Sequence, residues 1–295
     1  MSFTVRKLHP LFAAELTGAD LAKEPDRGLV DLVEATVAEY AVVVVRDQEH
    51  IGDDEHIRFS RAFGPLELPP NLNFVGGRPG DVRRFRPELY DVSNLNNDGE
   101  IESPEALKRT YAKGNELFHT DSSFNALPTK WSLLFAHIVP PEGGETEFVD
   151  TRIAYEALPA DMKARVEGLM VEHNLWRSRE RSGFTDIEAL KRSLQPVTHP
   201  LVRTSASGRK ALYLGSHADH ILGMPLEEGR ALLDELVARA IEPQLRYVHS
   251  WRKGDLVIWD NRCTMHRATT FDYRNHKRDL RRTTINEYGP ERSAQ

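Results

Sequence analysis

The chain has 295 residues, of which 40% are hydrophobic and 28% charged, and its formal net charge at pH 7 is -6. These values are typical of a globular protein; they exclude a disordered or fibrous chain, and the acidic balance argues against a general nucleic-acid binder. The single cysteine, Cys263, excludes an intrachain disulfide and a cysteine-based zinc site. No apolar run reaches the ~18 residues of a membrane span, and the amino terminus lacks the apolar core of a secretory signal. We therefore expect a soluble, cytoplasmic protein that forms a single domain over residues 1–295.

The first part of the chain predicts two helices around a buried strand, after a short strand and turn in residues 1–20. From Asp26 to about Ala41 the apolar residues recur at helical spacing, with Asp26 as the N-cap. Consecutive β-branched residues in 41–45 predict a strand buried on both faces. A second helix is expected from Asp53, at an Asp-Asp cap, to Phe63, where Gly64-Pro65 ends it.

Two segments are predicted to lack regular structure. Residues 65–88 are rich in Pro, Gly, Asn and Arg without a period, which is typical either of a lid or binding loop or of a surface excursion. Residues 177–198 form a polar insertion that fits either a solvated connection or a mobile cover. We treat both as candidate lid insertions in the single domain.

The remaining elements predict a mainly β protein with flanking helices. Strands are expected at 89–94, in the His119 stretch and at 132–139, helices at 152–158 and 159–169, and further strands at 200–204 and 211–214. A helix at 225–241 carries an apolar stripe that suits a core. Short strands at 245–251, 255–259, 262–266 and 282–286 follow at the close spacing of an all-β sandwich or barrel.

The candidate chemistry centres on His119 and Asp121 in an apolar, aromatic frame. If the backbone is extended there, both side chains point to one face, and His266 would supply a third ligand from a distant segment. Two imidazoles and one carboxylate suit non-haem iron(II) with open positions. A second pair, His217 and Asp219, is followed at once by His220, and periodicity alone leaves open which pair holds a metal. An isolated His-x-Asp pair is more often a structural histidine beside a turn-forming aspartate.

The sequence resembles the taurine dioxygenase family of Fe(II)- and 2-oxoglutarate-dependent oxygenases, and within it the aryloxyalkanoate dioxygenases. The resemblance runs through most of the chain, and the passages that carry it are 8–14, 63–67 (Phe-Gly-Pro-Leu-Glu), 118–124, 139–150, 200–229, 259–267 and 278–282. It implies a double-stranded β-helix, or jelly roll.

The resemblance also implies roles for individual residues. It places iron on His119, Asp121 and His266, and His217 to His220 in a loop beside the site. Thr146 and Arg278 would bind the distal carboxylate of 2-oxoglutarate, as a hydroxyl and a guanidinium fork suit a carboxylate. The carboxylate of the second substrate would be bound by Arg282, with His217 as a further contact to it or a structural residue. The competing register assigns the arginine roles to Lys277 and Arg281.

The implied reaction is hydroxylation of a small acidic substrate with iron(II), 2-oxoglutarate and O2. For an aryloxyalkanoate such as 2,4-dichlorophenoxyacetate the products would be a phenol, glyoxylate, succinate and CO2. The alternatives are the same chemistry on a sulfonate, a sulfate ester or another carboxylate, a zinc hydrolase using the same three ligands, and a non-catalytic jelly-roll binding protein. The sequence leaves open whether the chain forms a homo-oligomer.

Overall fold

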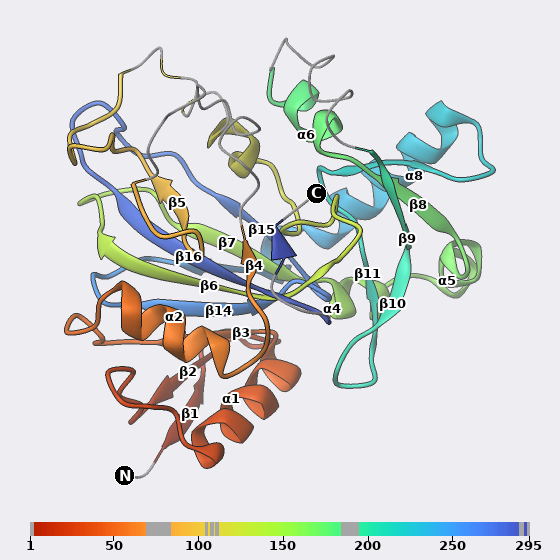
Figure 1. The fold of residues 1–295 in the computed structure, drawn as a ribbon. Helices are drawn as coiled ribbons and strands as arrows, with labels where there is room; N and C mark the ends of the chain where they lie inside the picture. The colour runs from red at the N-terminus through yellow and green to blue at the C-terminus, as the bar shows by residue number, and fades with distance from the viewer. Residues whose placement is uncertain are drawn as a thin grey trace.

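The computed structural model describes residues 3–68, 84–103, 106, 109, 112–183, 195–288 and 292–293. Its β-strands form a large sheet and several small ones (Figure 1). The elements up to residue 150 are β1 (Thr4–Lys7), β2 (Ala14–Thr17), α1 (Arg27–Tyr40), β3 (Val42–Val45), α2 (Asp53–Arg61), β4 (Glu67–Leu68), β5 (Tyr90–Ser93), η2 (Lys113–Glu116), β6 (Thr129–Ile138) and β7 (Thr146–Asp150). Those that follow are α4 (Thr151–Glu156), α5 (Ala160–Val166), β8 (Met170–His173), α6 (Leu175–Arg181), β9 (Val197–Pro200), β10 (Val202–Thr204), β11 (Lys210–Leu212), β12 (Ala218–Ile221), α8 (Leu226–Ala240), η3 (Pro243–Leu245), β13 (Arg246–His249), β14 (Leu256–Asp260), β15 (Thr264–Ala268), β16 (Asp279–Asn286) and β17 (Arg292–Ser293).

The large sheet has the strand order β1-β2-β3-β14-β6-β16-β5, and the small sheet has the order β13-β7-β15. From β13 to β16 the chain crosses between the two sheets at every strand, so both sheets contain strands from distant parts of the sequence. This alternation is the double-stranded β-helix predicted above. Its two inner faces share one apolar cluster, which includes Leu134, Val257 and Leu280 of the large sheet and Phe148 and Tyr247 of the small sheet.

Strand β3 is buried on both faces, as its run of valines predicts. Val43 and Val45 pack with α1 and α2 on the outer face of the large sheet, whereas Val42 and Val44 belong to the cluster between the sheets. The predicted cap of α1 is confirmed, because the Asp26 side chain accepts a hydrogen bond of 2.8 Å from the backbone N–H of Leu29. The outer helices therefore hold the large sheet in place behind the site.

A third layer covers the small sheet. A three-stranded sheet of order β12-β8-β9 and the helices α4 and α8 share an apolar cluster with residues of β7 and β15. Figure 1 shows α1 and α2 on one side of the molecule and α5, α8, β8 and β9 on another. Within the described residues, no helix combines the length and the apolar composition that crossing a membrane requires.

Several local predictions are wrong. Helix α2 is capped by Gly52, whose N–H donates to the Glu55 carboxylate over 2.9 Å, and it ends at Arg61. The predicted loop at 217–220 contains strand β12, which pairs with β8. The predicted structureless segment 65–88 contains β4, and 177–198 contains the end of α6 and the start of β9; these three elements are absent from the prediction. Residues 69–83 and 184–194, the middle parts of both candidate lids, lie outside the described residues.

Candidate active site

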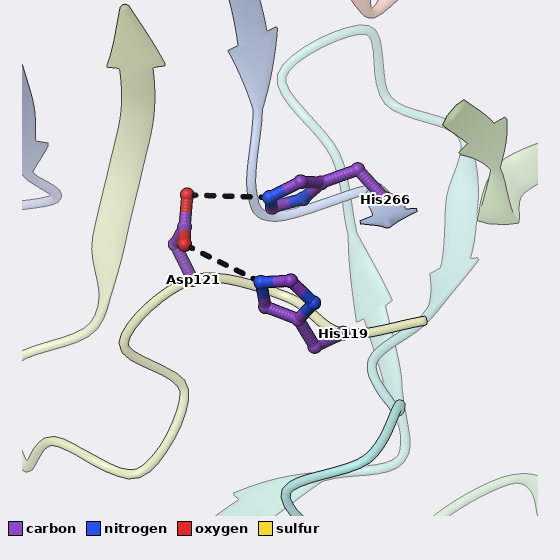
Figure 2. A group of neighbouring side chains, drawn as sticks. All are labelled: His119, Asp121 and His266. Atoms are coloured by element: carbon purple, nitrogen blue, oxygen red, sulfur yellow. Dashed lines mark ion pairs between the residues drawn. The ribbon is translucent and has the colours of Figure 1, made fainter. Parts of the chain in front are cut away.

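His119, Asp121 and His266 lie together between the two sheets, all at least nine-tenths buried. His119 Nε2 is 3.8 Å from Asp121 Oδ1, and His266 Nε2 is 3.8 Å from Asp121 Oδ2, so the two rings face the two oxygens of one carboxylate (Figure 2). One ligand atom from each side chain lies within 4.8 Å of the other two. Donors bonded to a single ion at about 2.0–2.2 Å have this kind of spacing. The group therefore fits one metal ion, and its two-histidine, one-carboxylate composition fits iron(II).

His119 and Asp121 do not lie on one regular strand, contrary to the sequence prediction. His119 forms an isolated bridge with His266, while Asp121 begins a turn in which Ser122 has a φ of 51°. The Leu117 carbonyl lies 2.8 Å from His119 Nδ1, an arrangement that has the ring donate there and leaves Nε2 free for a ligand. The ring therefore has its coordinating nitrogen turned toward Asp121.

Several polar groups orient the Asp121 carboxylate, among them Ser132, which the sequence did not indicate. Ser132 Oγ donates to Asp121 Oδ2 over 2.7 Å, and Arg282 Nη1 donates to Oδ1. Asn261 lies behind them, because its Nδ2 donates to Ser132 Oγ over 2.9 Å and its Oδ1 accepts from Trp259 Nε1 over 3.0 Å. Trp259 and Asn261 thus pack behind and orient the site.

The protonation states suit metal binding. Burial lowers the pKa of His119, and burial together with His119 lowers that of His266 to about 3. Burial alone would raise the pKa of the Asp121 carboxyl, but Arg282 and the two imidazoles outweigh it and hold that pKa below its usual range. Neutral imidazoles and an ionised carboxylate are the forms that coordinate a metal.

The second His-x-Asp pair is engaged elsewhere. Asp219 and His220 lie near Glu172 with ligand-like spacing. However, Asp219 Oδ1 accepts a hydrogen bond of 2.6 Å from Arg230, and Oδ2 accepts one of 3.0 Å from Asn174. This group also offers one imidazole and two carboxylates, whereas the group of His119, Asp121 and His266 offers the two imidazoles and one carboxylate that suit iron(II).

His217 lies against the His119 group, although its neighbours Asp219 and His220 do not. Its ring centroid is 5.8 Å from that of His119, and its Nδ1 lies 3.2 Å from both Ser123 Oγ and the Thr120 carbonyl. Burial lowers the pKa of His217 well below its ordinary value, so the ring is neutral. Gly215 allows the main chain just before His217 to pass close to that of His119, because a Cβ at residue 215 would lie 2.9 Å from the Cα of His119.

Arg278 is a buried cation without an acidic partner among the described residues. Its Nη1 and Nη2 donate to the carbonyls of Val92 and Gly144 over 3.2 and 3.4 Å, and its Nε has no hydrogen-bond partner there. Burial lowers the pKa of Arg278 to about 10, which still leaves the guanidinium charged at neutral pH. A buried guanidinium in this state calls for an anionic ligand.

Thr146 lies at the start of β7, two residues after Gly144. Its side chain is buried, and its Oγ1 accepts a hydrogen bond of 3.0 Å from Trp251 Nε1. A hydroxyl that accepts one bond still has its own O–H to donate. Thr146 and Arg278 therefore present donors suited to a carboxylate.

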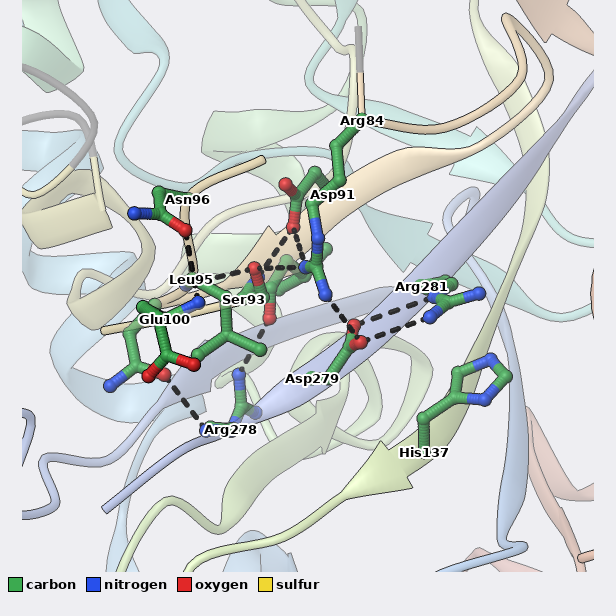
Figure 3. A network of polar contacts seen from close by, with 12 residues as sticks. Arg84, Asp91, Ser93, Leu95, Asn96, Glu100, His137, Arg278, Asp279 and Arg281 are labelled. Carbon is green, nitrogen blue, oxygen red and sulfur yellow. Dashed lines mark hydrogen bonds and ion pairs between the residues drawn. The ribbon is translucent and has the colours of Figure 1, made fainter. Parts of the chain in front are cut away.

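Lys277 and Arg281 point elsewhere. Lys277 pairs with Glu100 over 3.0 Å, and Arg281 pairs with Asp53 over 2.7 Å and with Asp279 over 3.0 Å. Figure 3 shows Asp279 between Arg281 and Arg84, which lies 2.8 Å from the same carboxylate. Side chains alternate along a strand, so Arg282 faces away from this network and toward Asp121.

The structure combines a jelly roll, a group of two histidines and one carboxylate that could hold a metal, and a buried arginine without an acidic partner among the described residues. Together they define the class of Fe(II)- and 2-oxoglutarate-dependent dioxygenases. Residues 4–284 match the family model described as "Taurine catabolism dioxygenase TauD, TfdA family", and the chain belongs to this family. The enzyme uses Fe(II), 2-oxoglutarate and O2.

Individual relatives agree with this family. The chain is 44% identical to the alpha-ketoglutarate-dependent 2,4-dichlorophenoxyacetate dioxygenase of Cupriavidus pinatubonensis, with 96% of this chain and 98% of that protein covered. It is 37% identical to the (S)-phenoxypropionate/alpha-ketoglutarate-dioxygenase of Sphingobium herbicidovorans, with 92% and 91% covered. Among solved structures, AAD-2 in complex with Mn(II) and N-oxalylglycine aligns with a TM-score of 0.86 and 40% identity over 99% of both chains.

Proposed function

We propose that this enzyme hydroxylates an aryloxyalkanoate, such as 2,4-dichlorophenoxyacetate, at the carbon next to the ether oxygen. The observation that carries the proposal is the Arg282 guanidinium beside Asp121, because it puts a cation for an acidic substrate next to the candidate metal. The relatives named for 2,4-dichlorophenoxyacetate and (S)-phenoxypropionate support this substrate class. Hydroxylation there gives a hemiacetal, which breaks down to a phenol and, from an aryloxyacetate, glyoxylate.

In this proposal His119, Asp121 and His266 hold the iron. Bound iron, with 2-oxoglutarate and O2, supplies oxidising chemistry that puts one oxygen atom into the substrate and the other into succinate, with release of CO2. The surrounding residues orient the three side chains that hold the iron and shield them from water. Ser132 and the Leu117 carbonyl keep the ligands oriented, and burial excludes water from the site.

In this proposal Arg278 and Arg282 each bind a different anionic ligand. Arg278 and Thr146 bind the distal carboxylate of 2-oxoglutarate, because they offer a fork and a hydroxyl with no acidic partner in the described structure. Arg282 binds the carboxylate of the second substrate. His217, as a neutral ring beside His119, contacts that substrate at its carboxylate or its ether oxygen.

We also propose that the whole chain works as one catalytic domain. The pairing of β3 with β14 supports this, because it joins the N-terminal part to the sheet that contains Arg282. The roles of segments 65–88 and 177–198 as lids, the cytoplasmic location and the oligomeric state stay predictions from the sequence.

The test is a substrate screen with two linked measurements. Purified enzyme receives Fe(II), 2-oxoglutarate and O2 with 2,4-dichlorophenoxyacetate, (S)- or (R)-phenoxypropionate, taurine or an alkyl sulfate, and succinate and phenol are measured together. We expect succinate release to require an aryloxyalkanoate and to match the phenol formed. Succinate release that responds to taurine or the alkyl sulfate and not to the aryloxy acids would contradict the proposal.

A further inference from the structure

The segment Phe63-Gly64-Pro65-Leu66-Glu67 belongs to the family resemblance, yet none of the roles above uses its glutamate. Glu67 is only 2% exposed. Its Oε1 accepts hydrogen bonds from three side chains, Tyr90 Oη over 2.6 Å, Ser122 Oγ over 2.9 Å and Asn125 Nδ2 over 3.3 Å. Its Oε2 has no partner among the described residues. Such a buried carboxylate is costly unless the contacts it makes are useful.

The main chain around Glu67 is fixed to the strand that carries the substrate arginine. Leu66 forms a bridge with Ile285 of β16. Asn286 N–H donates to the Pro65 carbonyl over 2.8 Å, and Asn286 Nδ2 donates to the Leu66 carbonyl over 3.3 Å. Glu67 is therefore held near Arg282 by backbone contacts that do not involve its own side chain.

Tyr90 connects Glu67 to Arg282. Tyr90 and Arg282 are direct cross-strand partners in the antiparallel pair of β5 and β16. The Arg282 guanidinium lies over the Tyr90 ring, 4.7 Å from its centroid, in a cation–π contact. Because the Tyr90 hydroxyl donates to Glu67, the carboxylate fixes the ring on which the guanidinium rests.

Glu67 also holds the turn that carries Asp121. Ser122, which follows Asp121, is in the left-handed backbone region with a φ of 51°. Asn125 closes the same turn, because its N–H donates to the Ser122 carbonyl over 2.9 Å. Both residues donate side-chain hydrogen bonds to Glu67 Oε1, so one oxygen atom joins this turn to Tyr90.

We infer that Glu67 is the positioning residue that fixes Arg282 relative to Asp121, through Tyr90 and the Ser122–Asn125 turn, and so sets the affinity for the acidic substrate. This inference rests on the proposed role of Arg282 in binding that substrate. Without the Tyr90 anchor, the long arginine side chain gains rotamers that point its fork away from the substrate carboxylate. The distal carboxylate of 2-oxoglutarate, bound at Arg278, is not affected by this loss.

The test measures binding without turnover. Protein loaded with Mn(II) and N-oxalylglycine is titrated calorimetrically with 2,4-dichlorophenoxyacetate, as wild type and as the variants Tyr90→Phe, Glu67→Leu and the double variant. Tyr90→Phe keeps the ring and removes only the hydroxyl. We expect each single variant to raise the Kd of the acid about tenfold, and the double variant to be no weaker than Glu67→Leu. The affinity for N-oxalylglycine should stay within about twofold of wild type in every variant, and the affinity for Mn(II) should do so in Tyr90→Phe, which leaves the Asp121 turn bonded to Glu67.

The control is Tyr247→Phe, which removes another buried tyrosine hydroxyl contact, 3.2 Å from His249 Nδ1, away from Arg282. It should leave the Kd of the acid unchanged. Wild-type protein that binds neither 2,4-dichlorophenoxyacetate nor phenoxypropionate would overturn the proposed substrate class, and this inference with it. If wild type binds the acid, then unchanged affinity in the variants, additive losses in the double variant, or equal losses for N-oxalylglycine would overturn the inference alone.

Discussion

The main chains of His119 and His266 form two reciprocal hydrogen bonds. His119 N–H donates to the His266 carbonyl over 3.0 Å, and His266 N–H donates to the His119 carbonyl over 2.9 Å. This reciprocal pair of hydrogen bonds holds the two segments together, and the two ring centroids lie 4.3 Å apart. The main chain itself therefore brings the two imidazoles side by side.

The buried state of Arg278 predicts a selective effect on 2-oxoglutarate. Arg278→Ala should raise the KM for 2-oxoglutarate about 30-fold or more, since it removes the cation of a buried charge pair. The KM for the acidic substrate should change far less. Lys277→Ala is the matched control, because Lys277 is partly exposed and pairs with Glu100. Steady-state kinetics with each substrate varied in turn checks this, and a larger effect of Lys277→Ala would restore the competing register.

The hydrogen bonds of Asn94 predict that it supports binding of 2-oxoglutarate indirectly, through Arg278. Its Oδ1 accepts from Arg278 N–H over 2.8 Å, and its Nδ2 donates to the carbonyls of Tyr273 and His276 over 3.1 and 2.9 Å. Asn94→Ala should loosen the segment before Arg278 and raise the Kd for N-oxalylglycine by about tenfold. Asn96→Ala, in the neighbouring turn, should have little effect. Calorimetric titration of Mn(II)-loaded protein with N-oxalylglycine measures this Kd, and an equal increase in both variants would refute the role of Asn94.

The position of Arg282 predicts a selective effect on the KM for the acidic substrate. Arg282→Ala should raise the KM for the acidic substrate by about 30-fold or more, with a much smaller change for 2-oxoglutarate. Metal affinity should not fall, because the substitution removes a positive charge from beside Asp121. The control is Arg281→Ala, on the opposite face of β16. Equal damage to both KM values would mean that the two arginine roles are wrongly divided.

Buried histidines predict a stability that falls in acid. Burial lowers the pKa of both His56 and His173 to about 3, from an ordinary value of 6.5. Between these values the unfolded chain binds more protons than the folded chain, so stability rises with pH across this window and is lost as pH falls. Each group contributes a slope of up to about 1.4 kcal/mol per pH unit. Urea unfolding of metal-free protein at pH 7 and pH 5 tests this, and His56→Gln should flatten the dependence; an unchanged slope would contradict it.

The sequence predicted the jelly roll, several of its helices and the grouping of His119, Asp121 and His266, because local patterns and the family resemblance carry that information. The valines of β3 and the Asp26 cap are local signals of this kind. The choice between His119-x-Asp121 and His217-x-Asp219 depended on the resemblance, because both pairs have the same spacing. The structure adds a physical distinction, since the imidazoles of both His119 and His266 face Asp121, whereas the group around Asp219 contains one imidazole, that of His220.

Other features had no local signal. Strand β12 is only four residues long and pairs with β8 from a distant part of the chain, whereas the resemblance implied a loop there. The partners of Glu67 depend on the register between β5 and β16, which places Tyr90 opposite Arg282. Ser132 orients Asp121 from the neighbouring β6 and looks like an ordinary strand residue in the sequence. Long-range strand pairing decides all three.

The central claim is that His119, Asp121 and His266 hold an iron ion to which 2-oxoglutarate binds. The most direct measurement is an anaerobic titration with Fe(II) and 2-oxoglutarate, followed by the metal-to-ligand charge-transfer absorption, in wild type and in the variants His266→Ala and His220→Ala. We predict the band at one iron per chain in wild type and in His220→Ala, and no band in folded His266→Ala. A band that survives in His266→Ala or disappears in His220→Ala would contradict the account.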